Sequence, residues 1–411
     1  MSITSPTELP RRRAATNTQS TYGWVERAFH WAIALLIPTA IALGIAAQRA
    51  GFASDAELAR KAWLFSAHKT VGIAILVVAL ARIAWAISQP RPAPLHPDRR
   101  VETFVAAWVH WLLYGSIVLV PVLGWAHHAT SEGFAPIWWP FGQSLPFLPK
   151  DAHLTEVLAT LHVVFERVLV VALLLHVAGT IKHVIVDRDA TLARMWRGAD
   201  PGAAPIGPGH RAPLLAALAV WAVALAAGLA LAPSQEAAAS GVVVADGASN
   251  WTVRDGELAI SVTQLGTPVR GTFADWDAAI VFQPEPRSDG THGTVRVVVA
   301  TGSLTLGTVS DQATSAEFLA SEAFPEAVFE AVLRADAVEG AYVADGTFRL
   351  RDVAIPLRLP FTLDLADGTA EMVGQAQLDR RDFGMGPSYP DESSVGFGVA
   401  IDVALTAERT E

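Results

Sequence analysis

Long apolar runs fill the first half of the chain, and a two-residue alternation of apolar and polar positions fills the second half. A helix needs roughly 20 residues to cross a hydrocarbon layer about 30 Å thick. Five runs are long enough, and they lie at 29–47, 66–87, 104–126, 157–185 and 214–232. In the second half, every second residue is apolar from Val353 to Leu365 and from Val395 to Leu405, which is typical of half-buried strands. The pattern predicts a multidomain membrane protein with an all-α bundle followed by an all-β domain.

The β domain is expected to be antiparallel, because turn signals such as SDG, ADG and VEG separate its strands. A closed barrel and a two-sheet sandwich both fit this pattern, and only a barrel provides an interior that holds an elongated ligand. The stretch TSAEFLASEAF, which begins at Thr314, is expected to form one short helix.

Breaks in composition divide the chain into four parts. We expect a cytoplasmic tail at 1–22, a four-helix transmembrane domain at 23–198, a fifth transmembrane helix flanked by linkers at 199–244, and the β domain at 245–411. The linkers are the Pro/Gly-rich PGAAPIGPGHRAP, which begins at Pro201, and PSQEAAASG after the fifth run.

Charge gives the expected orientation. Lys and Arg favour the cytoplasmic side of a membrane, and they cluster before the first run, after the second and after the fourth. The amino terminus is therefore expected in the cytoplasm, and the β domain on the outer side of the membrane. The 411-residue chain is 52% hydrophobic, and its net charge of −10 belongs to the β half. We expect no nucleic-acid partner. The absence of cysteine excludes thiolate metal sites, disulfides and covalent haem attachment, which leaves histidine as the abundant metal ligand.

Four histidines fall at two matched depths of the predicted bundle. His162 and His176 are 14 residues apart in one span, which is roughly 21 Å along a helix and nearly the same face. With alternating spans, His30 lies level with His176 near the inner side, and His68 lies level with His162 near the outer side. Two imidazoles facing each other across a bundle are what a six-coordinate haem iron needs. We therefore predict two non-covalent haems b with bis-histidine ligation. An ion-transport path is the alternative.

Two further polar residues in the spans are candidates for cofactor binding. His110, in the third span, is expected to contact a quinone or a haem propionate, or else to be an interfacial histidine. Arg82 lies about four turns inward of His68 and needs an anion. A propionate of the inner haem is one candidate for that anion, and the alternative is an arginine that extends to the membrane surface.

Residues 20–198 resemble the bacterial cytochrome b561 family. The resemblance lies in FHW around His30, AHKTVGIAILVVALARI from Ala67, HWLLYGSIVLVPVLGW from His110, and the histidine pair fourteen apart. It implies that His30, His68, His162 and His176 ligate two haems b. It also implies that the protein passes electrons between quinone and a second, unidentified redox partner. The family core has four spans, so the fifth span is an addition.

Residues 248–408 resemble the YceI-like family of periplasmic, lipocalin-like barrels that bind a polyisoprenoid chain. The matching pieces are LGTPVRGTFADWDAAIVFQPEP, SAEFLASEAFPEAVFEA and LDRRDFGMGPSY. This resemblance implies a lipocalin-like antiparallel barrel with ubiquinone or another isoprenoid lipid as its ligand.

Together these features predict an inner-membrane di-haem cytochrome that carries a lipid-binding barrel. The alternative is a membrane-anchored lipid carrier whose helices are not redox active, and a haem enzyme with five-coordinate iron is a third reading. Whether the protein is an electron carrier or a quinone-linked oxidoreductase, and whether it forms a homodimer, is left open.

Overall fold

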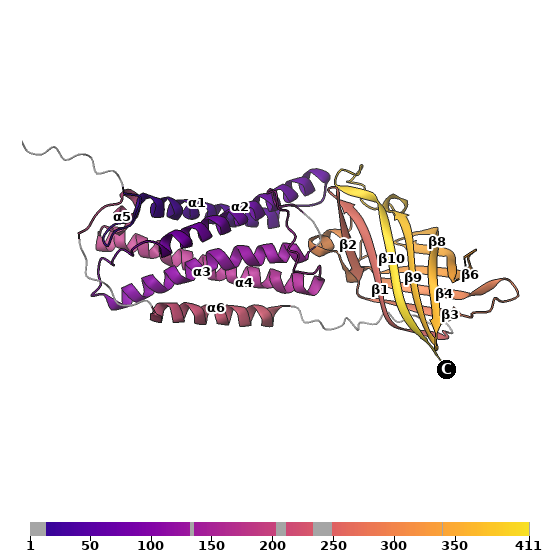
Figure 1. The fold of residues 1–411 in the computed structure, drawn as a ribbon. Coiled ribbons are helices and arrows are strands. Elements are labelled where there is room, and N and C mark those ends of the chain that lie inside the picture. Colours follow the sequence, from indigo (N-terminus) through magenta and orange to yellow (C-terminus); the bar gives the residue numbers. More distant parts are fainter. Residues whose placement is uncertain (1–13, 132–134, 203–210, 233–248, 339, 411) are drawn as a thin grey trace, which may run out of the picture.

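Six α-helices make up the described part of the first half of the chain (Figure 1). The structure is a computed structural model, and it describes residues 14–131, 135–202, 211–232, 249–338 and 340–410. The helices are α1 (Trp24–Arg49), α2 (Asp55–Ile87), α3 (Arg100–Thr130), α4 (Ala152–Lys182), α5 (Thr191–Arg197) and α6 (Arg211–Leu231), and a π-helical turn, His183–Asp187, extends α4. Most of the two linkers predicted around the fifth span lies outside the described residues.

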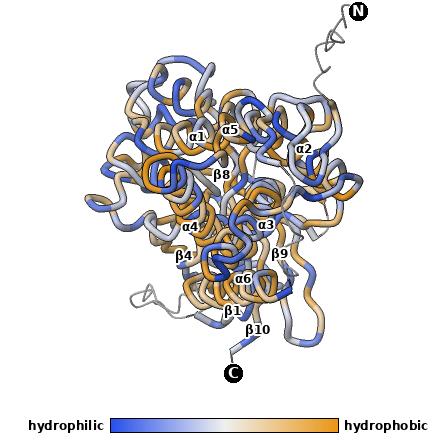
Figure 2. The backbone as a smooth tube through the Cα atoms, turned by 90° about the vertical axis from the view of Figure 1, so that its left-hand side faces the viewer, coloured by the Kyte–Doolittle hydropathy of each residue, from blue (hydrophilic) through white to orange (hydrophobic). Residues whose placement is uncertain are grey.

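All five predicted spans are confirmed as helices long and apolar enough to cross a membrane. Two of them begin with a side-chain cap: the Ser54 side chain accepts a hydrogen bond from the Glu57 N–H, and Asp151 accepts one from the Leu154 N–H. Seen along the bundle in Figure 2, the helices are largely hydrophobic, and hydrophilic positions gather in the segments that connect them.

The bundle core lies where α1, α2, α3 and α4 meet. Its buried residues include Ile37, Ile75, Ile117 and Phe165. The added helix α6 packs against α3 and α4, on the side of the bundle opposite to α1 (Figure 1). Gly228 allows this approach, because a Cβ at that position would lie 2.5 Å from the Leu161 side chain.

The second half of the chain is a closed antiparallel barrel, as predicted. Its strands are β1 (Trp251–Gln264), β2 (Thr267–Phe273), β3 (Trp276–Phe282), β4 (Thr291–Ala300), β5 (Leu304–Thr305), β6 (Glu326–Ala335), β7 (Ala341–Leu350), β8 (Val353–Ala366), β9 (Thr369–Asp379) and β10 (Val395–Arg409). The spatial order is β10-β9-β8-β7-β6-β4-β3-β1, pairing of β10 with β1 closes the ring, and β2 and β5 continue from β1. A closed ring leaves no open sheet edge. The two alternating runs seen in the sequence form β8 and β10.

The predicted helix in TSAEFLASEAF is wrong. Helix α7 is only Ser310–Thr314, and the residues that follow form turns. Ala320 has a positive φ of 50°, a left-handed conformation that cannot continue a right-handed helix. The turns bring Phe318 and Leu319 to the barrel cavity. This end of the barrel faces the bundle where α1 ends and α2 begins (Figure 1).

Candidate metal centres in the bundle and cavity of the barrel

Two pairs of imidazoles face each other across the bundle. His30 of α1 lies beside His176 of α4 with ring centroids 6.1 Å apart, and His68 of α2 lies beside His162 of α4 at 6.5 Å. The structure thus brings together the residues that the sequence paired by depth. Their role as iron ligands stays a prediction.

Both separations fit two ligands on one metal ion. A metal–nitrogen bond of about 2.0 Å plus about 1.1 Å from nitrogen to ring centroid puts two in-line imidazole centroids roughly 6.2 Å apart. The observed 6.1 and 6.5 Å lie close to that value. The residues present therefore fit a group held between two imidazoles at each level.

The outer imidazoles are oriented by backbone carbonyls. His68 Nδ1 donates to the Ala40 carbonyl at 2.8 Å, and His162 Nδ1 donates to the Val120 carbonyl at 3.0 Å. Because a carbonyl oxygen can only accept, Nδ1 carries the hydrogen and Nε2 keeps its lone pair for a metal. Metal-bound histidines are commonly held in this way.

Two glycines leave room for these outer rings. Gly44 lies one turn after Ala40, and Gly124 lies one turn after Val120. A Cβ at Gly44 would lie 3.1 Å from His68 Cε1, and a Cβ at Gly124 would lie 2.9 Å from His162 Cε1. Each imidazole therefore packs directly against the backbone at a glycine, and a side chain at that position would push the imidazole away. Neither glycine was predicted from the sequence, because the contact depends on which face of each helix meets the histidine.

His110 lies beside the inner pair. Its ring centroid is 5.1 Å from that of His176, and its Nδ1 donates to the Ala106 carbonyl at 2.6 Å. A separation of 5.1 Å is shorter than two in-line ligands of one ion require, so His30 is the better partner for His176. The position suits a residue that adjoins the inner site, and its predicted contact with a quinone or propionate stays a prediction.

Arg82 turns into the bundle toward Glu26. The Nε of Arg82 lies 3.3 Å from Oε1 of Glu26, and its guanidinium lies 5.1 Å from the centre of the Tyr114 ring. Its side chain is only 12% exposed, so it does not extend to the membrane surface. Neither partner of Arg82 was predicted from the sequence. Oε2 of Glu26 has no hydrogen-bond partner among the described residues, and the predicted contact of Arg82 with a propionate stays a prediction.

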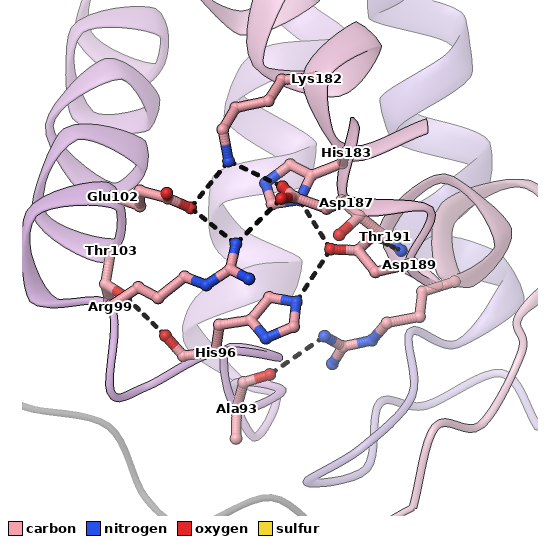
Figure 3. Close-up of polar contacts among 11 residues, drawn as sticks. Ala93, His96, Arg99, Glu102, Thr103, Lys182, His183, Asp187, Asp189 and Thr191 are labelled. Carbon is pink, nitrogen blue, oxygen red and sulfur yellow. Dashed lines mark hydrogen bonds and ion pairs between the residues drawn. The ribbon is translucent and has the colours of Figure 1, made fainter. Parts of the chain in front are cut away.

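A charged cluster joins the end of α4 to α5 and to the loop before α3 (Figure 3). Lys182 Nζ lies 2.8 Å from Asp187 and 3.0 Å from Glu102, while His96 and His183 both contact Oδ2 of Asp189. His183, Asp187 and Asp189 have the donor atoms of a metal site. The ammonium of Lys182 already neutralises Asp187, so the cluster acts as an ion-paired lock between these segments.

Asp189 is charged at every ordinary pH. Burial would raise the pKa of its carboxyl, but hydrogen bonds from the hydroxyl and N–H of Thr191 and from His183 and His96 outweigh burial and lower that pKa to about 2. Since an unfolded Asp titrates near pH 3.9, this group stabilises the fold above about pH 4, and the contribution is lost as pH falls toward 2.

The barrel encloses a cavity of about 270 Å³. Apolar side chains from nearly every strand line it, including Phe282, Phe329 and Phe361. The few polar side chains on its wall are Gln264, Thr301, Gln312 and Arg380. All four lie at the end of the barrel that carries α7 and the start of β10, which is the end facing the bundle.

The fold and these two sites define a multi-pass membrane protein with paired histidines in its bundle and a lipocalin-like barrel with an apolar cavity. Residues 21–198 match the sequence model of the family "Prokaryotic cytochrome b561", and residues 248–407 match that of the "YceI-like domain". The chain thus joins a region that matches the prokaryotic cytochrome b561 family to a region that matches the YceI-like domain.

Relatives of each half are also found among known proteins. "Cytochrome b561 homolog 2" of Escherichia coli K12 is 27% identical over 187 residues, which are 44% of this chain and 93% of that protein. "Probable superoxide oxidase CybB" of Yersinia pestis is 26% identical over 175 residues, 42% of this chain and 94% of that protein. The crystal structure of Burkholderia cenocepacia BcnA covers 37% of this chain and 95% of its own, with 22% identity and a TM-score of 0.34.

Proposed function

We propose that the protein passes electrons through two b-type haems in the bundle and binds an isoprenoid lipid in the barrel. His30 and His176 hold the inner haem, and His68 and His162 hold the outer one. The observation that carries the proposal is the presence of two imidazole pairs, 6.1 and 6.5 Å apart, on opposite levels of one membrane bundle. A bound haem supplies one-electron chemistry, and ligation on both faces leaves the iron no open position for a substrate.

The residues of the chain position and insulate these groups. The carbonyls of Ala40 and Val120 fix the outer imidazoles, and the apolar core between the two levels excludes water. Near the inner pair, the Arg82–Glu26 ion pair supplies charges that can balance an anionic group. We propose quinone as the electron donor or acceptor, because the same chain carries a barrel related to isoprenoid binders.

We propose that the amino terminus is cytoplasmic and the barrel periplasmic. Most basic residues of the connecting segments lie between α2 and α3 or after α4, at the end of the bundle away from the barrel: Arg91, Arg99, Arg100, Lys182, Arg188, Arg194 and Arg197. Arg49 and Lys150 lie at the barrel end. Cytoplasmic ends of membrane helices are enriched in such residues. The outer haem pair is then on the same side of the membrane as the barrel.

A second candidate function is superoxide oxidation, which the name of the Yersinia relative suggests for that protein. The observation in its favour is the ammonium of Lys69, which is buried beside His68 and donates to the Ala135 carbonyl at 2.7 Å. In its protonated form, this group would favour the approach of an anion to the outer pair. Superoxide would then give up one electron, leave as dioxygen, and a quinone would accept the electron.

The absorbance spectrum of the purified full chain tests the proposal. Reduced minus oxidised spectra should show a broad or split b-type band, and the same sample should contain about two haems per chain, as four axial histidines require. A folded but colourless preparation, even with haem supplied during expression, would favour the anchored lipid carrier. The rate at which the haems are reduced is then measured with a quinol and, separately, with enzymatically generated superoxide. The faster reductant identifies the electron source.

Replacing Gly124 with alanine should weaken the outer haem site. The added Cβ would lie 2.9 Å from His162 Cε1 and would push the imidazole out of line. Misplacing a ligand through its supporting contacts typically costs 10- to 100-fold in affinity, so about one of the two haems should be lost on dilution. Gly302→Ala is the control, because Gly302 lies in the barrel, away from both histidine pairs, and a Cβ there would meet only the Ser321 side chain, at 3.8 Å. Full retention of both haems in Gly124→Ala would show that this close contact is not needed.

A further inference from the structure

The barrel is docked on the bundle through one continuous apolar cluster. Leu58 and Ala62 of α2 are buried together with Val269, Leu306 and Tyr389 of the barrel. At the centre of the contact, the Tyr389 hydroxyl donates a hydrogen bond to the carbonyl of Phe52, in the loop between α1 and α2. Tyr389 is only 1% exposed. The bundle and the end of the barrel that bears α7 are thus in direct contact.

A chain of hydrogen bonds leads from that contact into the barrel cavity. Gln312 Nε2 lies 3.0 Å from the Tyr389 hydroxyl, and Gln264 Nε2 lies 3.1 Å from Gln312 Oε1. Both glutamines line the cavity. The chain therefore runs from the loop of the bundle, through Tyr389 and Gln312, to Gln264 at the cavity wall.

The Phe52 carbonyl fixes the direction of every bond in this chain. A carbonyl only accepts, so the single hydroxyl hydrogen of Tyr389 goes to Phe52, and Tyr389 must accept from the Gln312 amide nitrogen. The oxygen of Gln312 then faces Gln264 and accepts from the amide nitrogen of Gln264. Burial raises the pKa of Tyr389 to about 12, so the hydroxyl keeps its hydrogen at any physiological pH.

One acceptor is left over at the cavity. Oε1 of Gln264 has no hydrogen-bond partner among the described residues, although the residue is only 4% exposed. A buried acceptor without a partner is unfavourable, and a ligand group that donates to it should gain roughly 5- to 150-fold in affinity. The nearby Arg380 cannot serve, because its Nε and both Nη atoms already donate to backbone carbonyls. A hydrogen-bond donor on a ligand in the cavity would supply this partner.

We propose that the docked barrel selects a prenyl lipid whose head group bears a hydroxyl, such as a prenol, phenol or quinol, and holds that hydroxyl at Gln264. The inference rests on the proposed lipid binding and adds the chemical class and direction of the ligand. The head group lies at the end that faces the bundle, and the apolar tail extends toward Phe282 and Phe361. A head group with only acceptors, such as a quinone or an ether, leaves Gln264 unsatisfied.

Farnesol and farnesyl methyl ether test this preference, because they share one chain and differ in a single donor. The purified full chain, freed of lipid, is equilibrated with labelled farnesol, and each compound is used as an unlabelled competitor. Partition into empty micelles is subtracted. Farnesol should compete at about tenfold lower concentration, the factor that one unpaired buried acceptor implies. Equal competition by the two compounds would overturn the inference while leaving lipid binding intact.

Two variants test the source of the preference. Gln264→Leu removes the free acceptor, so the two competitors should become equivalent. Tyr389→Phe removes the hydroxyl that fixes the direction of the chain, so the preference should fall several-fold. Unchanged selectivity in either variant would contradict the assigned role of that residue. Gln377→Leu is the matched control, since Gln377 is exposed on the outside of β9 and should leave the tenfold ratio unchanged.

Failure of the two proposals gives different results. If neither compound binds the wild-type chain, the proposed lipid binding itself is wrong. If both bind equally, only the inference about the head group fails. Neither result depends on haem content, because farnesol and its ether are not redox active.

Discussion

Replacing His162 with alanine should remove the outer haem and keep the inner one, so the haem-to-protein ratio should fall from about two to about one. His162 lies 6.5 Å from His68 between ring centroids, and His68 faces no second imidazole at this distance among the described residues. With one axial ligand gone, the outer iron would be five-coordinate and weakly held. The inner pair, His30 and His176, is untouched by the change.

Difference spectra and a pyridine haemochrome assay on the same sample measure this result. His153→Ala is the control, because it makes the same substitution on the same helix without altering either pair. His110→Ala gives a second comparison: since the structure favours His30 as the partner of His176, the His110 variant should keep both haems. Loss of haem in His110→Ala with retention in His30→Ala would reassign the inner ligand. If the His162→Ala variant keeps two haems per chain, the assignment of His162 as a ligand of the outer haem is wrong.

The sequence predicted the parts of the fold that follow from periodicity. Five apolar runs gave the five spans, and the two-residue alternation gave β8 and β10, because burial on one face imposes these periods on any sequence. The depth of the four histidines followed from rise per residue and alternating topology. The pairs that these two rules predicted are the pairs that the structure brings together.

The sequence could not predict features that depend on how the elements face one another. The rotation of α1 and α3 decides that Gly44 and Gly124 support the outer imidazoles, and no single-helix pattern reveals it. The pairing of Arg82 with Glu26 joins residues 56 positions apart. The turns after α7 follow from cavity contacts of Phe318 and Leu319, which outweigh a locally helical composition.

The docking of the barrel was equally hidden. The hydrogen bond between Tyr389 and Phe52 joins residues 337 positions apart. Nothing in the sequence of either domain alone indicates where the other domain docks. Its consequence is chemical as well as mechanical. A carbonyl in the bundle loop determines which atom Gln264 presents inside the barrel, so the state of docking and the ligand that the barrel prefers are coupled through one hydrogen-bonded chain.

Replacing Arg380 with methionine should strongly destabilise the barrel. Arg380 is only 3% exposed, and its guanidinium donates to the carbonyls of Met385, Gly386, Tyr389, Val395 and Gly396 at 2.7 to 3.2 Å. These bonds tie the turn after β9 to the start of β10 at the end that docks on the bundle. Methionine fills a similar volume and leaves all five carbonyls without this donor. Leaving these acceptors without a donor costs about 1–3 kcal/mol for each one that water does not reach, so the total loss should be at least about 3 kcal/mol.

A loss of that size should lower the melting temperature of the barrel by on the order of 10 °C for a domain of this length. Hydrogen exchange of barrel peptides, read by mass spectrometry during heating of the full chain, follows the transition of the barrel. Arg381→Met is the matched control: its guanidinium pairs with Asp379 at 2.6 Å with 58% of the side chain exposed, and exposed pairs contribute only about 0–1 kcal/mol. Equal melting temperatures for the two variants would show that Arg380 does not hold this end together. Arg380 also donates to the backbone carbonyl of Tyr389 and so helps to hold that residue in place. The Arg380 variant should therefore lose the preference for farnesol even below its melting temperature.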